Sequence, residues 1–419
     1  MSQDKALPDW RTDSSHGTSP RRWAVAAAIL LVGGADLYNQ LVMTAIRPLV
    51  MEQLKISSTQ VSAVMMAPLI CGIFFALVAG SLGDRFGPTA VIRVSLVLAI
   101  AGAVIRVFAT TYLVTFIAML LIGVAAMVMY SNVAKLYAAW FKPSQMGIAM
   151  GLTMLGPALG STAAHLTGAK FGTPKNLYAF AAGVLVVISA YVFIAVRDRP
   201  KGAAAPVRAA DAPKAKGHLG YVLRVPYIWC LGLAMFLFMG SQMTVMSFTT
   251  SMLHLGKEMS LEHAGEMSSM FSFGALLGGL LVPAVAAKIG RMKPVVMAGG
   301  LIAGVCVYLA WLAAPSDWLM ACLFLAGMSM TSVPTLVTPA PAMLDRIGPE
   351  RAGTAGGVLS TFQNAGGYIV PTFVVSPIAG ENYTVIAIMG GVTSALVLAV
   401  LLAVPEWGHR NKSPHGAHG

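Results

Sequence analysis

Charged residues are scarce in this chain, and their scarcity argues against an ordinary water-soluble protein. Asp, Glu, Lys and Arg make up 11% of the 419 residues, whereas soluble domains carry roughly 25%. A surface with so few charges cannot face water over its whole area. Most of the chain must therefore face lipid or its own interior.

Cysteines and the short motifs of enzyme chemistry are also nearly absent. The four cysteines occur singly, with no Cys-x-x-Cys spacing, which argues against a zinc site or a disulfide framework. The sequence contains no phosphate-binding loop, no cluster of metal ligands and no nucleophile elbow. We therefore expect no cofactor, no metal and no enzymatic activity, and we expect buried free thiols at Cys71, Cys230, Cys306 and Cys322.

What the chain has in abundance is long apolar runs. Hydrophobic residues make up 57% of it, and many runs approach or exceed the length that crosses ~30 Å of hydrocarbon, where the backbone must be helical. We predict an all-α membrane protein with twelve transmembrane helices. The expected spans are 23–50, 60–83, 88–109, 112–139, 144–168, 177–197, 224–251, 262–287, 294–314, 317–343, 350–378 and 383–404.

The distribution of positive charge predicts the orientation of these spans. With twelve spans, 22 of the 28 Lys and Arg residues fall on the side that holds both termini, and 6 fall on the other. Positive residues concentrate on the cytoplasmic side of membrane proteins. We therefore expect a multi-pass protein of the cell membrane with both termini in the cytoplasm. The net charge of +12 then reflects topology in a lipid bilayer, and it does not indicate a nucleic-acid partner.

Two landmark segments occur twice along the chain. Residues 80–87 correspond to 283–290 at an offset of 203, and residues 143–151 correspond to 349–357 at an offset of 206. Parallel repeats of six helices are a recurrent transporter design, so we predict two pseudo-symmetric six-helix bundles. The expected segments are a cytoplasmic N-terminal tail (1–22), an N-terminal bundle (23–197), a cytoplasmic linker (198–223), a C-terminal bundle (224–404) and a cytoplasmic C-terminal tail (405–419).

The loop after the second span carries a recognisable motif. Residues 80–87, Gly-Ser-Leu-Gly-Asp-Arg-Phe-Gly, resemble the loop motif G-x-L-x-D-R-x-G-R/K-R/K of the major facilitator superfamily, although Pro and Thr stand at 88–89 where two basic residues are usual. The resemblance implies a transporter of twelve spans with a cytoplasmic gate at this loop. Charged groups at helix ends can pair across the halves in one state and separate in another, or they can simply anchor the interface. The expected gating residues are Asp84, Arg85 and Gly87.

Other segments resemble two branches of that superfamily. Residues 46–48 (Ile-Arg-Pro) and 102–106 (Gly-x-x-x-Arg) resemble the cyanate and nitroimidazole permeases, and residues 132–136 (Asn-Val-Ala-Lys-Leu) resemble the nitrate/nitrite porters. Those porters carry an arginine within the second and eighth spans, and residues 62–82 and 264–287 contain none. The resemblance therefore implies a small anion or a small organic acid and does not single out nitrate.

One carboxylate lies deep within the first span. Asp36 stands about thirteen residues into it, and ionisable residues inside spans are costly and therefore functional candidates. On a helix, Gln40 falls within about 40° of Asp36 and Arg47 within about 20°, with Asn39 on the flank. A carboxylate in hydrocarbon is costly to keep charged, which suits a group that binds and releases protons. Asp36 is the predicted proton-coupling residue; the alternative is a packing hydrogen bond to a neighbouring span.

Polar and basic residues in the spans are the candidates for substrate binding. An arginine near a span end can attract an anion, or it can extend to the membrane surface without such a role. In the family that the chain resembles, the first, fourth, seventh and tenth spans line the central cavity. The predicted substrate-binding residues are Asn39, Gln40, Arg47, Arg106, Asn132, Lys135, Ser241, Gln242, Thr331 and Thr335. Two other ionisable residues are ranked lower because they fall near span ends, within expected reach of water: His165 and Glu266.

Proline and glycine mark two unusual spans. The prolines of the tenth span, Pro334, Pro339 and Pro341, interrupt the helical hydrogen-bond ladder and permit bending. The fifth span carries glycines that resemble the family's antiporter motif and that would also permit close helix contact. Both interpretations remain open for Gly147, Gly151, Gly156 and Gly160.

The hypothesis that joins these observations is a monomeric secondary transporter. It moves a small anion or organic acid by alternating access, with a proton as the coupling ion. One alternative is an efflux antiporter for an amphiphilic small molecule, which the glycines of the fifth span would fit. Another is a membrane receptor or scaffold that no longer transports, which the incomplete second copy of the gating loop would fit. The expected partners are a small-molecule substrate, protons and the lipid bilayer.

Overall fold

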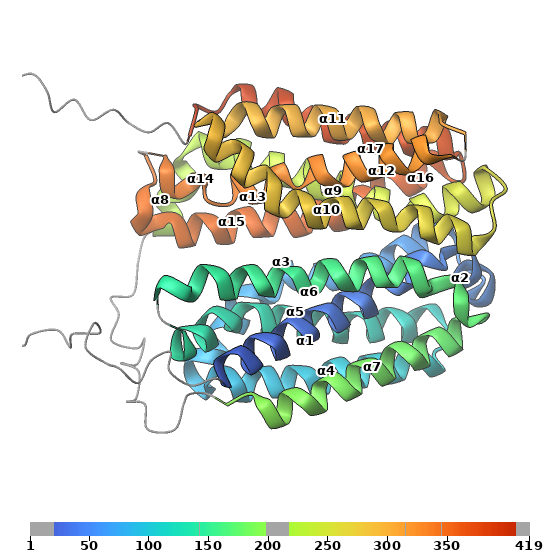
Figure 1. Ribbon diagram of the computed structural model, residues 1–419, viewed down its shortest axis with the longest axis horizontal. Helices are drawn as coiled ribbons and strands as arrows, with labels where there is room; N and C mark the ends of the chain where they lie inside the picture. Colours follow the sequence, from blue (N-terminus) through green and yellow to red (C-terminus); the bar gives the residue numbers. More distant parts are fainter. Residues whose placement is uncertain (1–20, 142, 198–217, 315, 345, 408–419) are drawn as a thin grey trace, which may run out of the picture.

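The computed structural model describes residues 21–141, 143–197, 218–314, 316–344 and 346–407. These residues form helices and contain no β-strand. The helices make two bundles that lie side by side along their length, one from each half of the sequence (Figure 1). The expected N-terminal tail, the first part of the expected linker and most of the expected C-terminal tail lie outside the described residues.

The N-terminal bundle contains seven of the described α-helices and one short 3₁₀ turn. Ser57 caps the second long helix through a capping box with Gln60, since each side chain bonds the backbone N–H of the other. The elements are α1 (Arg21–Ala45), α2 (Arg47–Leu54), α3 (Ser58–Phe86), α4 (Pro88–Phe108), α5 (Tyr112–Trp140), α6 (Pro143–Thr167), η1 (Gly168–Phe171) and α7 (Pro174–Ala195).

The C-terminal bundle repeats this arrangement with more interruptions. It begins with α8, which the last part of the expected linker forms. The elements are α8 (His218–Arg224), α9 (Pro226–Gly256), α10 (Leu261–Ile289), α11 (Lys293–Leu312), α12 (Asp317–Met330), α13 (Ser332–Val337), α14 (Ala340–Met343), α15 (Gly348–Ile369), the π-helix η3 (Val370–Val375), α16 (Ser376–Ala379) and α17 (Tyr383–Leu402).

Each expected span coincides with a helix or with a chain of broken helices, but the count of twelve spans is not confirmed. In the described part of the chain, ten helices are long and apolar enough to cross a membrane. The expected fifth and eleventh spans, α6 and α15, are not among them. Both are rich in Gly, Ser and Thr, and α15 also contains Gln363 and Asn364, so their hydropathy falls below that of their neighbours.

The predicted interruption of the tenth span is confirmed. The span is split into α12, α13 and α14, with breaks at Thr331 and at Thr338–Pro339. The first span is also broken, because Ile46 separates α1 from α2 and Pro48 is the second residue of α2. The eleventh span contains the π-helix at Pro371, which the sequence analysis did not predict.

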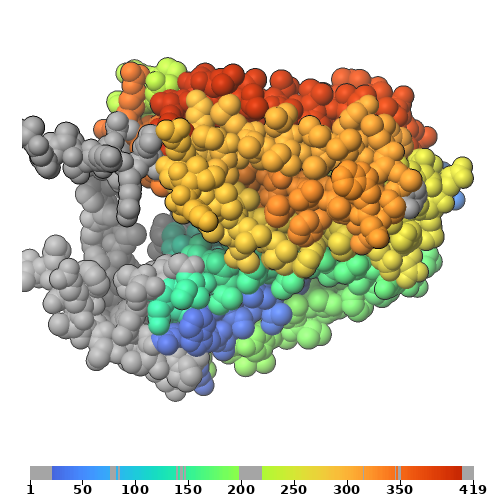
Figure 2. All heavy atoms as spheres, turned by 45° about the horizontal axis from the view of Figure 1, so that its top comes forward, coloured from blue at the N-terminus to red at the C-terminus, as the bar shows by residue number. Residues whose placement is uncertain are grey.

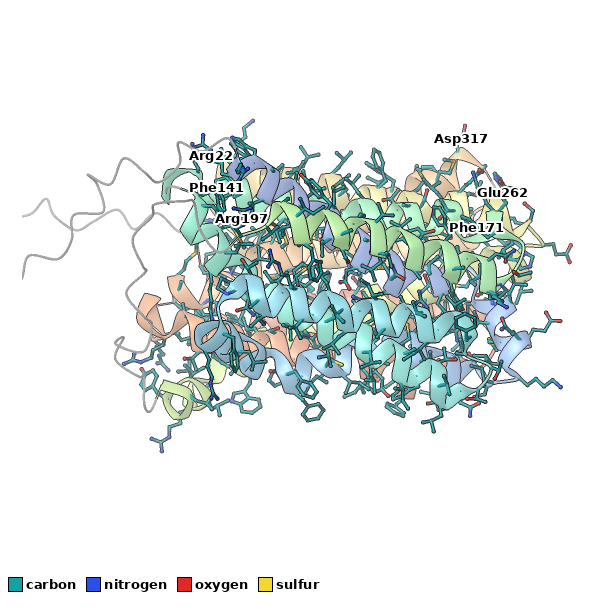
Figure 3. All side chains as sticks on the ribbon, turned by 90° about the horizontal axis from the view of Figure 1, so that it is seen from below. Arg22, Phe141, Phe171, Arg197, Glu262 and Asp317 are labelled. Atoms are coloured by element: carbon teal, nitrogen blue, oxygen red, sulfur yellow. The ribbon has the colours of Figure 1, made fainter. Side chains whose placement is uncertain are left out.

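The bundle of long helices has two ends. We call one the tail end; it holds Arg22, Phe141 and Arg197 (Figure 3). We call the other the α2 end; it holds α2 and the residues Phe171 and Glu262. The long helices run between these two ends.

The two halves meet along α3 and α6 of the N-terminal bundle. α3 packs against α15, η3 and α16, while α6 packs against α10. Figure 2 shows the yellow-to-red C-terminal half lying directly on the blue-to-green N-terminal half. Among the described residues, side-chain hydrogen bonds cross this boundary between Ser62 and Ser376 (Oγ–Oγ 2.8 Å) and between Ser161 and Ser272 (2.7 Å). All four serines are buried.

Candidate functional site

Asp36 lies inside the N-terminal bundle. It is 4% exposed, and its Oδ2 accepts a hydrogen bond of 2.9 Å from Gln40 Nε2. The predicted shared face of these two residues is therefore confirmed. Within the part of the chain that the structure describes, no Lys, Arg or His forms an ion pair with Asp36. Asp36 borders a space of about 10 Å³ that Ser95 of α4 and Ala125 of α5 also line.

Arg106 and Asn39 connect α4 to α1 deep in the same bundle. Arg106 is 1% exposed; its Nη2 donates to Asn39 Oδ1 at 3.0 Å, and its Nη1 donates to the Asn39 carbonyl. Asn39 Nδ2 in turn donates to the carbonyls of Ala35 and Ala181. The ring of Tyr178 lies 4.6 Å from the guanidinium carbon. These contacts lie within one bundle, and Arg106 lines none of the cavities described in this section. Both observations favour a packing role for the pair.

Arg47 lies at the boundary between the halves, at the first residue of α2. It is 2% exposed. Its Nη2 donates to Ser58 Oγ at 2.8 Å and to the Ser58 carbonyl at 2.9 Å, and its Nη1 donates to Ser62 Oγ at 3.0 Å. The ring of Phe248, from α9 in the other half, lies 4.0 Å from the guanidinium carbon. Arg47 therefore contacts both halves, and its surroundings differ from those of Arg106.

Asn132 and Lys135 lie on α5 toward the tail end. Asn132 is fully buried, and its Nδ2 donates to the Val128 carbonyl at 2.8 Å. A Cβ placed at Gly83 would stand 1.6 Å from Asn132 Oδ1, so this glycine of the loop motif admits the asparagine against α3. Lys135 is half-buried. The two predicted residues are thus close to the gating loop.

The candidates of the C-terminal half divide into two kinds. Ser241 Oγ donates to the Gly390 carbonyl of α17 at 2.6 Å and is fully buried, which favours packing. Thr331 and Thr335 donate to carbonyls one turn earlier in their own span. Gln242 is half-buried and makes no side-chain hydrogen bond within the described residues. Gln242 is therefore the candidate of this half whose polar atoms are most available to a substrate.

The predicted gating loop is a one-residue connection. Gly87 ends α3 and precedes α4 with φ +86°, a conformation that glycine adopts without strain. Arg85 is exposed, and its guanidinium carbon lies 5.1 Å from the Phe86 ring centre. The backbone of Asp84 is helical, and its side chain lies outside the described residues. The role of the three residues as a gate stays a prediction.

The expectation for His165 was wrong. The sequence placed it within reach of water, but the structure buries it to 3% exposure, because α6 is covered by both α1 and the C-terminal half. Its Nδ1 lies 3.0 Å from the Ser161 carbonyl, and its Nε2 lies 3.4 Å from Thr44 Oγ1. A Cβ placed at Gly265 of α10 would stand 2.6 Å from the His165 carbonyl oxygen, so the C-terminal half packs directly against this part of α6. Only the tertiary packing of three helices could reveal this position.

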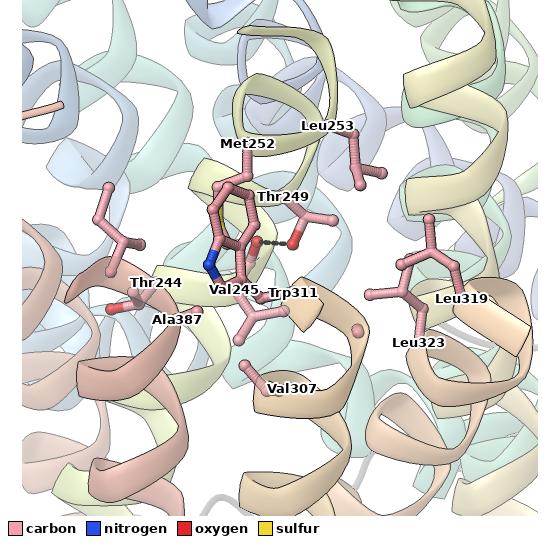
Figure 4. Close-up of a pocket in the computed structure, with 12 residues that line it drawn as sticks. Thr244, Val245, Thr249, Met252, Leu253, Val307, Trp311, Leu319, Leu323 and Ala387 are labelled. Atoms are coloured by element: carbon pink, nitrogen blue, oxygen red, sulfur yellow. Dashed lines mark hydrogen bonds between the residues drawn. The ribbon is translucent and has the colours of Figure 1, made fainter. Parts of the chain in front are cut away.

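Two further cavities lie in or beside the C-terminal half. The first lies inside the C-terminal half between α9, α11, α12 and α17, and it holds about 30 Å³ among mostly apolar side chains such as Val307, Trp311 and Leu323 (Figure 4). The second lies between the halves at the α2 end and holds about 160 Å³. Arg47, Ser58, Phe248, Ser251 and Tyr383 are among the residues that line it. We call this second space the Arg47 cavity.

Comparison with known proteins places the sequence in one family. The sequence profile described as Major Facilitator Superfamily matches residues 28–371. A relative from Bacillus subtilis (strain 168), an uncharacterized MFS-type transporter named YceJ, is 25% identical over 390 residues, which are 90% of this chain and 93% of the relative. An uncharacterized protein of Archaeoglobus fulgidus is 26% identical over 144 residues, or 34% of this chain and 65% of that protein. These relatives lend no support to the narrower resemblance to cyanate permeases or nitrate porters.

Solved structures share the fold at low sequence identity. A bacterial homologue of the human lysosomal transporter Spinster, in an inward-facing and occupied conformation, superposes with a TM-score of 0.73 at 14% identity, over 92% of this chain and 96% of that one. Its unoccupied form gives 0.71 at 13% identity with the same coverage. The nucleoside transporter NupG gives 0.73 at 14% identity, over 90% of this chain and 99% of its own.

Proposed function

Because the chain belongs to the Major Facilitator Superfamily, we propose that it moves a small anion or organic acid across the cell membrane by proton-coupled alternating access. It is a multi-pass membrane protein with the fold of a small-molecule transporter. In the proposal both termini are cytoplasmic, so the tail end faces the cytoplasm and the α2 end faces outward. The protein acts as a monomer of twelve spans.

The observation that carries the proposal is a buried acid without a basic partner. Asp36 is nearly inaccessible, and Gln40 supplies the hydrogen bond that its carboxyl group receives. A charged carboxylate in such surroundings is unfavourable unless it is paired. A proton can supply the missing charge, and a change in water access during the transport cycle would then load and release it. This supports Asp36 as the coupling residue.

The anionic substrate class rests on positive charge at the boundary between the halves. Arg47 is buried there, and it forms no ion pair with a carboxylate within the described residues. Lys135 lies near the opposite end, next to Asn132. An anion crossing the protein would meet one cation near each end of its path. Along the path between these two cations, we retain Gln40, Gln242 and Thr335 as residues that contact the substrate.

The amphiphile-efflux alternative is less well supported. Met239 and Met243 of α9 pack directly against α15, because a Cβ at Gly367 would stand 2.9 and 3.3 Å from their Cγ atoms. They fill space between helices and do not line a large apolar cavity. The glycines of α6 also have a packing role, since Gly156 and Gly160 admit the backbone of α1.

Transport in proteoliposomes tests the proposal. An inward proton gradient should accelerate uptake of a radiolabelled small monocarboxylate by the unmodified protein. Asp36→Asn should lose this acceleration while it retains exchange of the same substrate across the membrane, because the amide cannot carry a proton. Glu266→Gln is the matched control, since this carboxylate is about half exposed and should not matter. If Asp36→Asn responded to the gradient like the unmodified protein, proton coupling at Asp36 would be refuted.

A further inference from the structure

The Arg47 cavity lies at the α2 end and is walled by both halves of the chain. Arg47 and Ser58 come from the N-terminal half, whereas Ser251 and Tyr383 come from the C-terminal half. The space of about 160 Å³ admits several water molecules. It is therefore large enough for a small organic ion.

The guanidinium group of Arg47 supplies a positive charge to the cavity wall, and its orientation is fixed. Ser58 and Ser62 bind the two terminal nitrogens of Arg47, and the ring of Phe248 covers the guanidinium at 4.0 Å. A buried charge without a counter-charge is unfavourable, and within the described residues no carboxylate lies within ion-pair distance of Arg47. Met65 Sδ accepts a further contact from Nη1 at 3.7 Å, so the terminal nitrogens are occupied, whereas Nε has no hydrogen-bond partner within the described residues. The Nε–H and the charge of an arginine preferentially bind a carboxylate.

A second buried polar group lacks a partner in the same cavity. Ser251 is 3% exposed, and its hydroxyl makes no hydrogen bond. Buried hydroxyl groups are normally hydrogen-bonded. A ligand oxygen held between Arg47 and Ser251 would satisfy both. Apolar residues that also line the space, Met51 and Leu255, can accommodate a short hydrocarbon tail.

We propose that the Arg47 cavity binds a small monocarboxylate and that the bound ligand holds the α2 end closed. The ligand bridges the halves, with its carboxylate on Arg47 and Ser251 and its tail against Met51 and Leu255. Separation of the halves at this end dismantles the site. A ligand that binds only one of two states shifts the population toward that state. The inference extends the proposed substrate class, but it concerns binding and closure and does not require proton coupling.

Binding to the purified full-length protein provides the first test, with propionate as the probe and propionamide as its uncharged counterpart. At constant ionic strength, propionate should bind and propionamide should not. Arg47→Gln should weaken binding at least about tenfold, because the charged hydrogen bonds are lost, and Ser251→Ala should weaken it severalfold. Lys175→Gln removes an exposed cation at the same end and should leave binding unchanged. Equal binding in Arg47→Gln and the unmodified protein would overturn the site.

Glu381 gives a variant with the opposite expected sign. Its side chain also lines the cavity, and the residue is exposed, so its negative charge opposes an anionic ligand across water. Glu381→Gln should therefore tighten propionate binding, by about two- to fivefold at low salt. Weaker binding in this variant would overturn the assignment of a plain anion and indicate a ligand that also carries a positive group.

Closure of the α2 end can be measured at a pair of residues outside the Arg47 cavity. In a background with the four native cysteines replaced by serine, Ser161→Cys and Ser272→Cys place thiols on facing positions of α6 and α10, where the serine oxygens are 2.7 Å apart. Propionate should speed the formation of this disulfide, and the addition of Arg47→Gln should remove the effect. If propionate bound but left the rate unchanged, the closing role would be refuted. Because no gradient or transport is involved, a failure of the proposed function would not affect this result.

Discussion

Two fully buried arginines, Arg47 and Arg106, have different surroundings. Arg106 bonds Asn39 within one bundle, and the ring beside it, Tyr178, belongs to the same half. Arg47 is covered by Phe248 from the opposite half. Rearrangement of the halves would change the surroundings of Arg47 and leave those of Arg106 intact. We therefore propose a functional role for Arg47 and a structural one for Arg106.

The structural role of Arg106 predicts a loss of stability. Arg106→Met should leave the buried Asn39 oxygens without their donors and should lower the free energy of unfolding by about 1–3 kcal/mol. Thermal unfolding in detergent measures this. Arg85→Gln, at an exposed arginine, should change stability by no more than about 0.5 kcal/mol. Arg106→Met with unchanged stability and reduced carboxylate binding would instead restore Arg106 as a substrate residue.

At the scale of helices, glycines let α1 and α6 pack closely. Cβ atoms at Gly156 and Gly160 would stand 2.1 Å from the Leu30 carbonyl oxygen and 2.0 Å from the Gly34 carbonyl oxygen. Only glycine permits this approach of the two backbones. The same helix α6 contributes Ser161 and the backbone of His165 to the boundary with the C-terminal half, against Ser272 and Gly265 of α10. The position of that boundary therefore depends on how closely α6 packs against α1.

This contact predicts opposite effects for two glycine substitutions on one helix. Gly160→Ala should destabilise the protein by about 1–3 kcal/mol, because α1 and α6 must separate to admit the methyl group. Gly151→Ala meets no atom within 4 Å and should be neutral or stabilise by up to about 1 kcal/mol, because alanine favours the helix. Thermal unfolding of both variants checks the pair. Equal stability of the two would contradict the close packing of α1 and α6.

Features that depend on residues close in the sequence could be predicted from it, whereas features that depend on the packing of distant segments could not. Helical periodicity predicted that Gln40 would share a face with Asp36, and proline chemistry predicted the interruptions near Pro334. The partner of Arg47 could not be predicted, because Phe248 lies 201 residues later in the sequence and reaches it only through the packing of the two halves. His165 was misplaced for the same reason. The loop motif predicted the family but not the substrate.

At the scale of the whole molecule, side-chain hydrogen bonds join the halves, within the described residues, at the α2-end parts of α3 and α6. Ser62–Ser376, Ser161–Ser272 and the stacking of Phe248 on Arg47 each join one half to the other. At the α2 end, Lys170 of η1 also lies 3.9 Å from Glu262 of α10. This ion pair is exposed and therefore contributes little to stability. Alternating access requires these contacts to separate in part of the cycle.

A cross-link between the halves should therefore stop transport. Ser62→Cys with Ser376→Cys, in the cysteine-free background, should form a disulfide that abolishes uptake, and a reductant should restore it. Thr250→Cys with Ser268→Cys is the matched control, since these side chains face each other at 3.1 Å within the C-terminal half and their disulfide should leave transport intact. Full transport by the cross-linked Ser62–Ser376 variant would refute the rearrangement.

The stacking of Phe248 on Arg47 also has an electrical consequence. While the ring covers one face of the guanidinium, less water reaches this charge from that side, and part of the membrane voltage would fall across it. Withdrawal of Phe248 would admit water from the α2 end and move the voltage drop to the other side of Arg47, although the residue itself stays in place. One elementary charge crossing the full field of 100 mV changes its energy by about 2.3 kcal/mol. The balance between the two states should therefore depend on membrane potential even when the substrate and the proton together carry no net charge.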